Sequence, residues 1–174
     1  MENTAEPLAS SAPNAGYPLT DQPKLRFVVG TFDSWPQVRD ALSDLRVRGL
    51  ILDSFNCLAL RRQFSGKIIQ APDQTSVSVE ALPFASGPMA CTSGPLADCL
   101  RERIDSGAQS LKEALARWLI PRHAAYFQDA VHARKIVFWI KVTDADQERR
   151  AYQTLLVHSS NSVGVHDLVL PGEY

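Results

Sequence analysis

The chain lacks the short motifs by which many enzymes and nucleotide-binding proteins are recognised. Its 174 residues contain no G-x-G-x-x-G, no G-x-x-x-x-G-K-[ST], no H-E-x-x-H and no G-x-S-x-G. These motifs mark dinucleotide sites, phosphate-binding loops, zinc proteases and hydrolase nucleophiles, respectively. We therefore expect a protein that is not an enzyme and that carries no cofactor.

An excess of charge and long apolar runs are also missing. The formal net charge is −1, which leaves no surplus of Lys and Arg to neutralise phosphates and argues against nucleic-acid binding. No apolar run approaches the roughly 20 residues that span a bilayer, and the start MENTAEPLASSAPNAG lacks the features of a secretory signal. Three cysteines without C-x-x-C spacing fit a reduced interior. We expect a cytoplasmic protein with no membrane contact.

The chain begins with a segment that has no apolar periodicity. Residues 1–23 are rich in Ala, Ser, Pro and Asn, which predicts a disordered tail, and residues 24–171 are expected to form a single domain. Leu25 to Phe32 is a β-branched and aromatic run typical of a strand. A helix with Pro36 in its first turn follows and should end at Gly49. Ile51 to Leu60 returns as a strand, which completes a βαβ unit.

Residues 61–134 read as an insertion made of a short hairpin and two helices. KIIQ and SVSVEAL are predicted to pair, and PFASGPMACTSGP is predicted to be an irregular loop. One apolar stripe then recurs at helical spacing through Leu100, Ile104, Ala108, Leu111, Leu115 and Leu119, which predicts a continuous helix. Gly107 lies inside this pattern and should weaken the helix by about 1 kcal/mol relative to Ala, and it could mark a kink or a close helix contact. Pro121 opens a second helix, from Arg122 to about Arg134.

A second βαβ unit closes the chain. Ile136 to Val142 is nearly all apolar and is predicted to be a central strand. Asp144 and Gln147 start a helix that carries Tyr152, Leu155 and Leu156 inward, and residues 163–170 form the last strand. Two βαβ units with an insertion between them predict an α+β fold, a ferredoxin-like split βαβ sandwich with two helices on one sheet face.

Three stretches carry a resemblance to a known family. The segment VVGTFDSWPQVRDALSDLRVRGLILDSFNCLAL is similar to the opening of heat-induced, general-stress-protein (YflT-type) domains. ALARWLIPRHAAYFQDAVHARKIVFWIKV resembles their Ile-Pro bend, helix and strand, and DADQERRAYQTLLVHSSNSVGVHDL resembles their closing helix and strand. The resemblance implies a stress-associated protein without an established activity or a catalytic residue set. The apolar middle usual in that family is replaced here by the charged DCLRERIDSGAQSLKEALARW, so no membrane-adjacent role is implied.

The four histidines do not suggest a metal site. His123 and His132 lie nine apart on one predicted helix and face different sides. His158 ends a helix and His166 lies on the last strand, and the sequence leaves open whether these two meet. We expect no metal.

The insertion is the predicted working part of the molecule. We expect it to mediate self-association, as in a homodimer, or docking of a protein partner. The predicted interaction surface comprises Leu111, Leu115, Trp118, Ile120, Pro121 and Tyr126. Two alternatives remain. One is a small-ligand-binding domain with a groove near the Ile-Pro bend, lined by Trp139. The other is a cofactor-independent enzyme of the dimeric α+β-barrel kind, with acid–base chemistry at a histidine such as His166.

Overall fold

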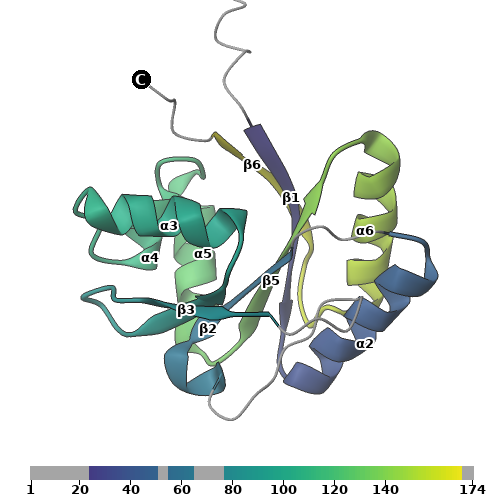
Figure 1. The fold of residues 1–174 in the computed structure, drawn as a ribbon, viewed down its shortest axis with the longest axis horizontal. Coiled ribbons are helices and arrows are strands. Elements are labelled where there is room, and N and C mark those ends of the chain that lie inside the picture. The colour runs from purple at the N-terminus through teal and green to yellow at the C-terminus, as the bar shows by residue number, and fades with distance from the viewer. Residues whose placement is uncertain (1–23, 51–54, 65–76, 170–174) are drawn as a thin grey trace, which may run out of the picture.

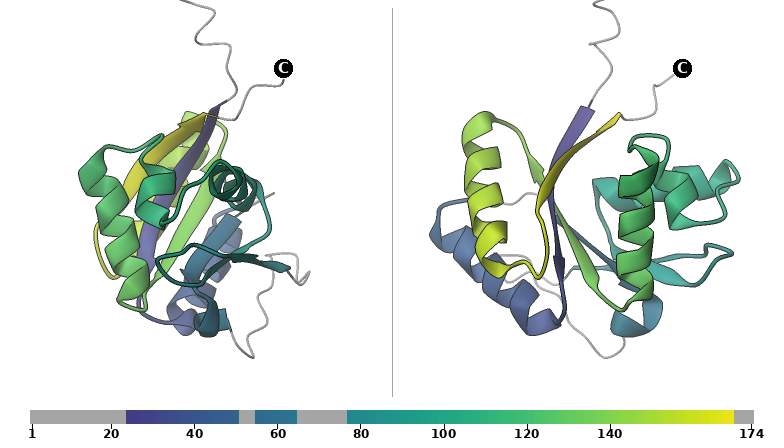
Figure 2. Two further views of the ribbon diagram at one scale, coloured as in Figure 1. Left: turned by 90° about the vertical axis from the view of Figure 1, so that its left-hand side faces the viewer. Right: turned by 180° about the vertical axis from the view of Figure 1, so that it is seen from behind.

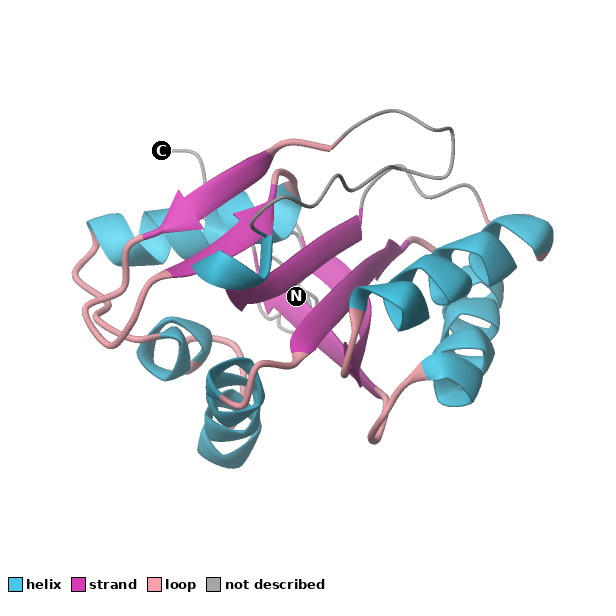
Figure 3. Cartoon of the chain, turned by 90° about the horizontal axis from the view of Figure 1, so that it is seen from below, coloured by secondary structure: helices cyan, strands magenta, loops and turns pink. Residues whose placement is uncertain are grey.

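One antiparallel sheet organises the molecule. The structure is a computed structural model, and it describes residues 24–50, 55–64 and 77–169. The elements of this part of the chain are β1 (Lys24–Phe32), α2 (Trp35–Val47), β2 (Phe55–Leu60), the 3₁₀ helix η3 (Arg61–Phe64), β3 (Val79–Leu82), β4 (Met89–Thr92), α3 (Pro95–Asp105), α4 (Leu111–Leu115), α5 (Pro121–His132), β5 (Ile136–Val142), α6 (Ala145–His158) and β6 (Gly164–Val169). Helices cover both faces of the sheet (Figures 1 and 3).

The six strands lie in the order β3-β4-β2-β5-β1-β6, and every neighbouring pair is antiparallel. The described residues therefore form an α+β protein with an open six-stranded antiparallel sheet and five α-helices, as the predicted fold class requires at this level. The prediction that Ile136–Val142 is a central strand is confirmed, because β5 pairs with both β1 and β2.

Successive side chains of the inner strands point to opposite faces and build two cores. Phe27 and Trp139 face α3, α4 and α5, and their rings meet edge to face with centroids 5.6 Å apart. Val28 and Phe138 face α2 and α6. The prediction of two helices on one face thus holds for α2 and α6, and the inserted helices cover the other face.

The first helix follows its sequence signals closely. Gln37 Oε1 accepts hydrogen bonds from the backbone N–H groups of Asp33, at 2.8 Å, and Ser34, at 3.2 Å, and so caps the start of α2. Gly49 adopts φ +82° just after the helix, as predicted for a left-handed terminating residue. The following strand begins at Phe55, and residues 51–54 of the predicted strand lie outside the described residues, as do the predicted tail and KIIQ.

The insertion differs from its prediction in the loop before α3. Met89–Thr92 lies within the segment predicted to be irregular, but it forms β4, which pairs with β2 on one side and β3 on the other. That part of the prediction is wrong. The hairpin seen in the described chain is therefore β3–β4, built from the second predicted strand and an unpredicted one.

The prediction of a single helix from Leu96 is wrong, and the chain breaks at Gly107, the position at which a kink was one of the expectations. α3 ends at Asp105, Gly107 takes φ +106°, and α4 starts anew after Ser110, whose Oγ accepts from the Glu113 N–H at 3.0 Å. The apolar stripe runs on across the break because both helices bury the same side against one core. The insertion therefore contributes three α-helices, not two.

The last two helices agree better with the sequence. α5 begins at Pro121 and buries Ala124 and Phe127, as its pattern predicts. In α6, Leu155 is fully buried, but Leu156 is 54% exposed, so the prediction that Leu156 points inward is wrong.

Candidate functional site

A cavity of about 440 Å³ lies between the first turns of α5 and the edge strand β6. We call it the α5–β6 cavity; Figure 2 shows α5 beside the yellow strand β6. Its walls are Val29, Arg122, His123, Tyr126, Phe127, Ser162, Val163, Gly164, Val165 and His166. Two imidazoles, a phenol and a guanidinium thus share a hollow with apolar walls.

The Ile-Pro bend brings the helical side of the cavity into place. Ile120 is extended, with φ −64° and ψ 153°, because a residue before proline avoids the helical region. Pro121 then starts α5 at a position where its missing N–H removes no helical hydrogen bond. Arg122 and His123 consequently fall in the first turn, and Tyr126 lies one turn further along the same helix.

His166 enters the cavity from the sheet. It lies opposite Phe27 in the β1–β6 pairing, so it shares the sheet face that packs against α5. Its ring centroid is 5.3 Å from that of His123 and 5.5 Å from that of Phe127. The second histidine at this site is therefore His123. His158 packs on the other face, where its Nε2 lies 3.0 Å from Asp44 Oδ2 between α6 and α2.

Gly164, the first residue of β6, gives the His166 ring more room than a residue with a side chain would. A Cβ atom added to Gly164 would lie 3.1 Å from His166 Nε2, closer than most real contacts. Gly164 therefore leaves the room in which the imidazole ring sits.

The surroundings of His166 favour its neutral form and lower its pKa. Burial lowers the pKa of His166, and the neighbouring His123 lowers it further, whereas Asp167 acts in the opposite direction. Asp167 is itself paired with Arg26, whose Nε and Nη2 donate to its carboxylate at 2.8 and 3.0 Å and lower the pKa of that carboxyl.

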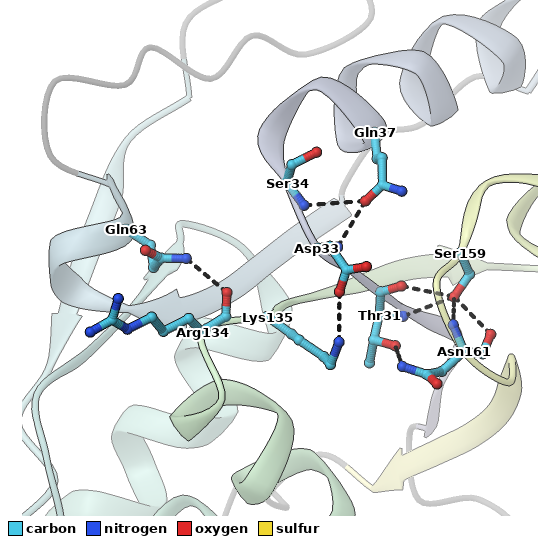
Figure 4. A network of polar contacts seen from close by, with 9 residues as sticks. All are labelled: Thr31, Asp33, Ser34, Gln37, Gln63, Arg134, Lys135, Ser159 and Asn161. Atoms are coloured by element: carbon cyan, nitrogen blue, oxygen red, sulfur yellow. Dashed lines mark hydrogen bonds and ion pairs between the residues drawn. The ribbon is translucent and has the colours of Figure 1, made fainter.

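A polar network at the end of α6 holds the loop that lines one wall. Ser159 Oγ donates to Thr31 O at 2.9 Å and accepts from the Thr31 N–H at 3.2 Å (Figure 4). Asn161 Nδ2 reaches Thr31 Oγ1 at 3.4 Å, immediately before Ser162 of the cavity wall. The same view shows Asp33 paired with Lys135 at the adjoining end of β1. The wall at residues 162–163 is therefore tied to the central sheet.

The predicted interaction surface divides into two parts. Leu111 and Leu115 are both 0% exposed and belong to the core under α3 and α5, so the expectation that they contact a partner is wrong for this fold. An amphipathic stripe looks the same whether it covers the protein's own core or another molecule.

The other predicted surface residues lie at the bend. Ile120 is 51% exposed, Pro121 is exposed and Tyr126 is 38% exposed. Trp118 is half-buried, and its indole N–H donates to Val169 O at 3.0 Å. Contact of these four residues with a partner stays a prediction. Of them, Tyr126 also lines the cavity, whereas Trp139, predicted to line a groove here, is fully buried behind Phe127.

Sequence reasoning missed Arg122 as a site residue. Acidic residues elsewhere in the insertion offset its charge. The one sequence signal that could indicate a site is the Pro-Arg-His order at a helix start. The sequence pattern bears on His123 only as a possible metal ligand. Its actual neighbour comes from a strand more than forty residues away.

Two further hollows among the described residues are less well defined as sites. The larger one, of about 840 Å³, has Phe64 in its wall, and the described chain is interrupted at 65–76 directly after that residue. The other, of about 580 Å³, is lined by charges of both signs, among which Arg26 pairs with Asp167 and with Glu148. The α5–β6 cavity is therefore the candidate site.

Within the described ranges, no group of three or more His, Cys, Asp or Glu side chains is placed to hold a metal ion. Cys57, Cys91 and Cys99 are buried and free, and burial raises the pKa of each thiol. None of the helices in the part of the chain that the structure describes has the length and apolarity needed to cross a membrane.

No protein-family model, curated protein or solved structure matches this chain.

Proposed function

We propose that this protein is a small-ligand-binding domain and that the α5–β6 cavity is its binding site. The observation that carries the proposal is the convergence of His123 and Tyr126 from α5 with His166 from β6 on one hollow with apolar walls. Its volume of about 440 Å³ lies within the range of roughly 300–1,000 Å³ common for ligand sites.

We further propose that β1, α2, β2, β5, α6 and β6 form a ferredoxin-like split βαβ sandwich, into which the insertion is set. The strand order β2-β5-β1-β6 supports this reading, since α2 links β1 to β2 and α6 links β5 to β6. The inserted helices α3–α5 cover the sheet face that bears Phe27 and Trp139. A dimeric α+β barrel needs this sheet face to be free to meet the same face of a second copy. Because the inserted helices cover it, the enzymatic alternative is a weaker candidate.

The test is a ligand screen by thermal shift with three proteins. A panel of small metabolites is added to the wild type, to His123→Ala and to His132→Ala. His132 is exposed near the other end of α5 and serves as the matched control. A ligand at about 100 times its Kd adds about 2.7 kcal/mol of stability, which raises Tm by roughly 5–10 °C in a domain of this size.

The expected result is a shift in the wild type and His132→Ala that is lost or reduced in His123→Ala. A flat response across the panel, or an equal shift in all three proteins, would contradict the proposal.

Self-association or partner docking through the bend is a second candidate. Ile120, 51% exposed, and Tyr126, 38% exposed, favour it, because they lie with the exposed Pro121 around one bend and offer apolar area that a partner could bury. A stress-associated role, as the resemblance implies, belongs to this candidate. Sedimentation across micromolar concentrations tests it with Ile120→Asp and, as a control of similar exposure on α6, Leu156→Asp. Association that is lost only in Ile120→Asp supports docking at the bend; a monomeric wild type refutes the self-association.

A further inference from the structure

We propose that the ligand of the α5–β6 cavity is a small organic acid, with its carboxylate between Arg122 and the two imidazoles and a compact apolar body against the remaining walls. This inference rests on the proposed function, because it names the chemical class that the cavity would take.

The charged groups of the cavity are all of one kind. Arg122, His123 and His166 can each present N–H donors or positive charge, and none of the lining residues that the structure describes is a carboxylate. The nearest acid on the strand, Asp167, points to the opposite sheet face and is held there by Arg26. The N-terminal end of the 12-residue α5 adds positive potential at the same place. An anion therefore meets donors without an opposing carboxylate.

The rest of the cavity would not suit an inorganic anion. Val29, Phe127, Val163 and Val165 supply aliphatic and aromatic surface, and Tyr126 adds the body of its ring. A phosphate or sulfate ion could use the donors of Arg122, His123 and His166, but against the apolar walls it would lose part of its hydration without gaining a contact there. An acid with a compact apolar body fills the same space and removes apolar surface from water.

Binding of an acid in this place must be coupled to protons. His166 faces His123, Arg122 and Tyr126 from α5, with Asp167 and its partner Arg26 on the sheet side. Burial and His123 keep the pKa of His166 low while the cavity is empty. A bound carboxylate favours the imidazolium, so by linkage its affinity rises as the pH falls through the region in which His166 takes up its proton.

The experiment measures binding by calorimetry at pH 6 and pH 8 with three probes: benzoate, its neutral isostere benzamide, and inorganic phosphate. We expect benzoate to bind at pH 6 roughly tenfold or more tightly than benzamide, as one charge-assisted contact predicts. Its affinity should fall several-fold at pH 8, and phosphate should bind more weakly than benzoate.

Variants separate the role of each group. Arg122→Gln and His166→Gln should lower benzoate affinity, and His166→Gln should also flatten the pH dependence. Arg117→Gln, an exposed arginine outside the cavity, is the matched control and should bind like the wild type. Gly164→Ala, which pushes the His166 ring without removing a charge, should weaken benzoate while leaving Arg122 intact.

Each contrary result has its own meaning. Equal binding of benzoate and benzamide, unaffected by Arg122→Gln, contradicts the proposal that the ligand is an acid, but still indicates a ligand site. Phosphate binding as tightly as benzoate contradicts the proposal that the ligand carries an apolar body. No saturable response to any probe at millimolar concentration overturns the inference, and the proposed function then depends on the metabolite screen and its His123→Ala comparison.

Discussion

Replacement of Asn56 by alanine should strongly destabilise the protein. Asn56 is fully buried on β2, where its Nδ2 donates to Thr92 O of β4 at 2.7 Å and its Oδ1 accepts from the Leu96 N–H of α3 at 3.3 Å. One side chain thus joins a strand pair to the start of the inserted helix. Alanine leaves a buried carbonyl and a buried amide without partners.

The magnitude follows from those two groups. Each buried group left without a partner costs about 1–3 kcal/mol, so Asn56→Ala should lower the free energy of unfolding by roughly 2–6 kcal/mol. For a domain of this size that corresponds to a fall in Tm of roughly 5–20 °C. Urea and thermal unfolding measure both quantities. The control is Asn161→Ala, an exposed amide with one long contact at 3.4 Å, which should cost less than about 1 kcal/mol.

Gly94 provides an independent check on the same node. Its φ is +152°, and an added Cβ would lie 2.9 Å from Asn56 Nδ2, so Gly94→Ala must displace the amide. In the Asn56→Ala background, Gly94→Ala should destabilise the protein less, because the Asn56 Nδ2 atom that the new Cβ would contact is absent. The losses in the free energy of unfolding should therefore be non-additive. A loss below about 1 kcal/mol in Asn56→Ala with an unchanged m-value, or strictly additive effects of the two substitutions, would refute the assigned role of Asn56.

Two further predictions concern the core and the charges. Leu111→Asp should abolish folding, whereas Ile120→Asp should change the free energy of unfolding by less than about 1 kcal/mol, as circular dichroism and urea titration would show; similar losses in both would contradict their burial. Because its folded pKa lies below the unfolded value, His166 makes stability fall as pH drops through about 6.5, and His166→Gln should remove that part of the slope; an unchanged slope would contradict it.

The elements with strong local signals were predicted well. β5 is a nearly all-apolar run that follows Lys135 and ends before Thr143 and Asp144, and its predicted bounds, Ile136 and Val142, are those observed. α5 starts at Pro121, whose fixed φ suits the first helical position. In both cases the deciding information lies within a few residues of chain, so no knowledge of distant partners is needed.

β4 illustrates what local reasoning cannot reach. Its four residues stand between glycines and prolines, and nothing in MACT demands a strand. Its conformation is set by pairing, with Cys91 opposite Leu58 of β2 and Ala90 opposite Ala81 of β3. Such pairing joins segments about ten to thirty residues apart, and sequence periodicity contains no record of it.

The cavity shows the same limit for function. Alternation along the last strand places His166 on one face, but its encounter with His123 depends on the β1–β6 register and on how α5 crosses the sheet. The bend at Ile120 and Pro121 belongs to the predicted interaction surface, yet the pattern cannot tell that the first-turn side chains Arg122 and His123 face a strand edge.

The break at Gly107 allows a direct test of whether local helix propensity or tertiary packing determines where a helix ends. If local propensity ruled, Gly107→Ala would fuse α3 to α4 and gain about 1 kcal/mol of helix stability. In the observed fold Gly107 has φ +106°, and the space around its Cα is open, so alanine meets no clash but takes up a strained backbone costing roughly 1–3 kcal/mol. Ser110 already caps α4, and Leu111 is anchored in the core, so the break should persist.

We therefore expect Gly107→Ala to lower the free energy of unfolding by roughly 1–3 kcal/mol with unchanged helical circular dichroism. Gly49→Ala, at φ +82° after α2, is the matched control and should show a similar loss. A rise in both stability and helical signal for Gly107→Ala alone would mean that the two helices are continuous in solution. The packing of α4 and α5 on the core would then differ from that described, and so would the position of His123 on α5. The geometry of the proposed site therefore depends on the helical break at Gly107 as well as on the bend at Ile120 and Pro121.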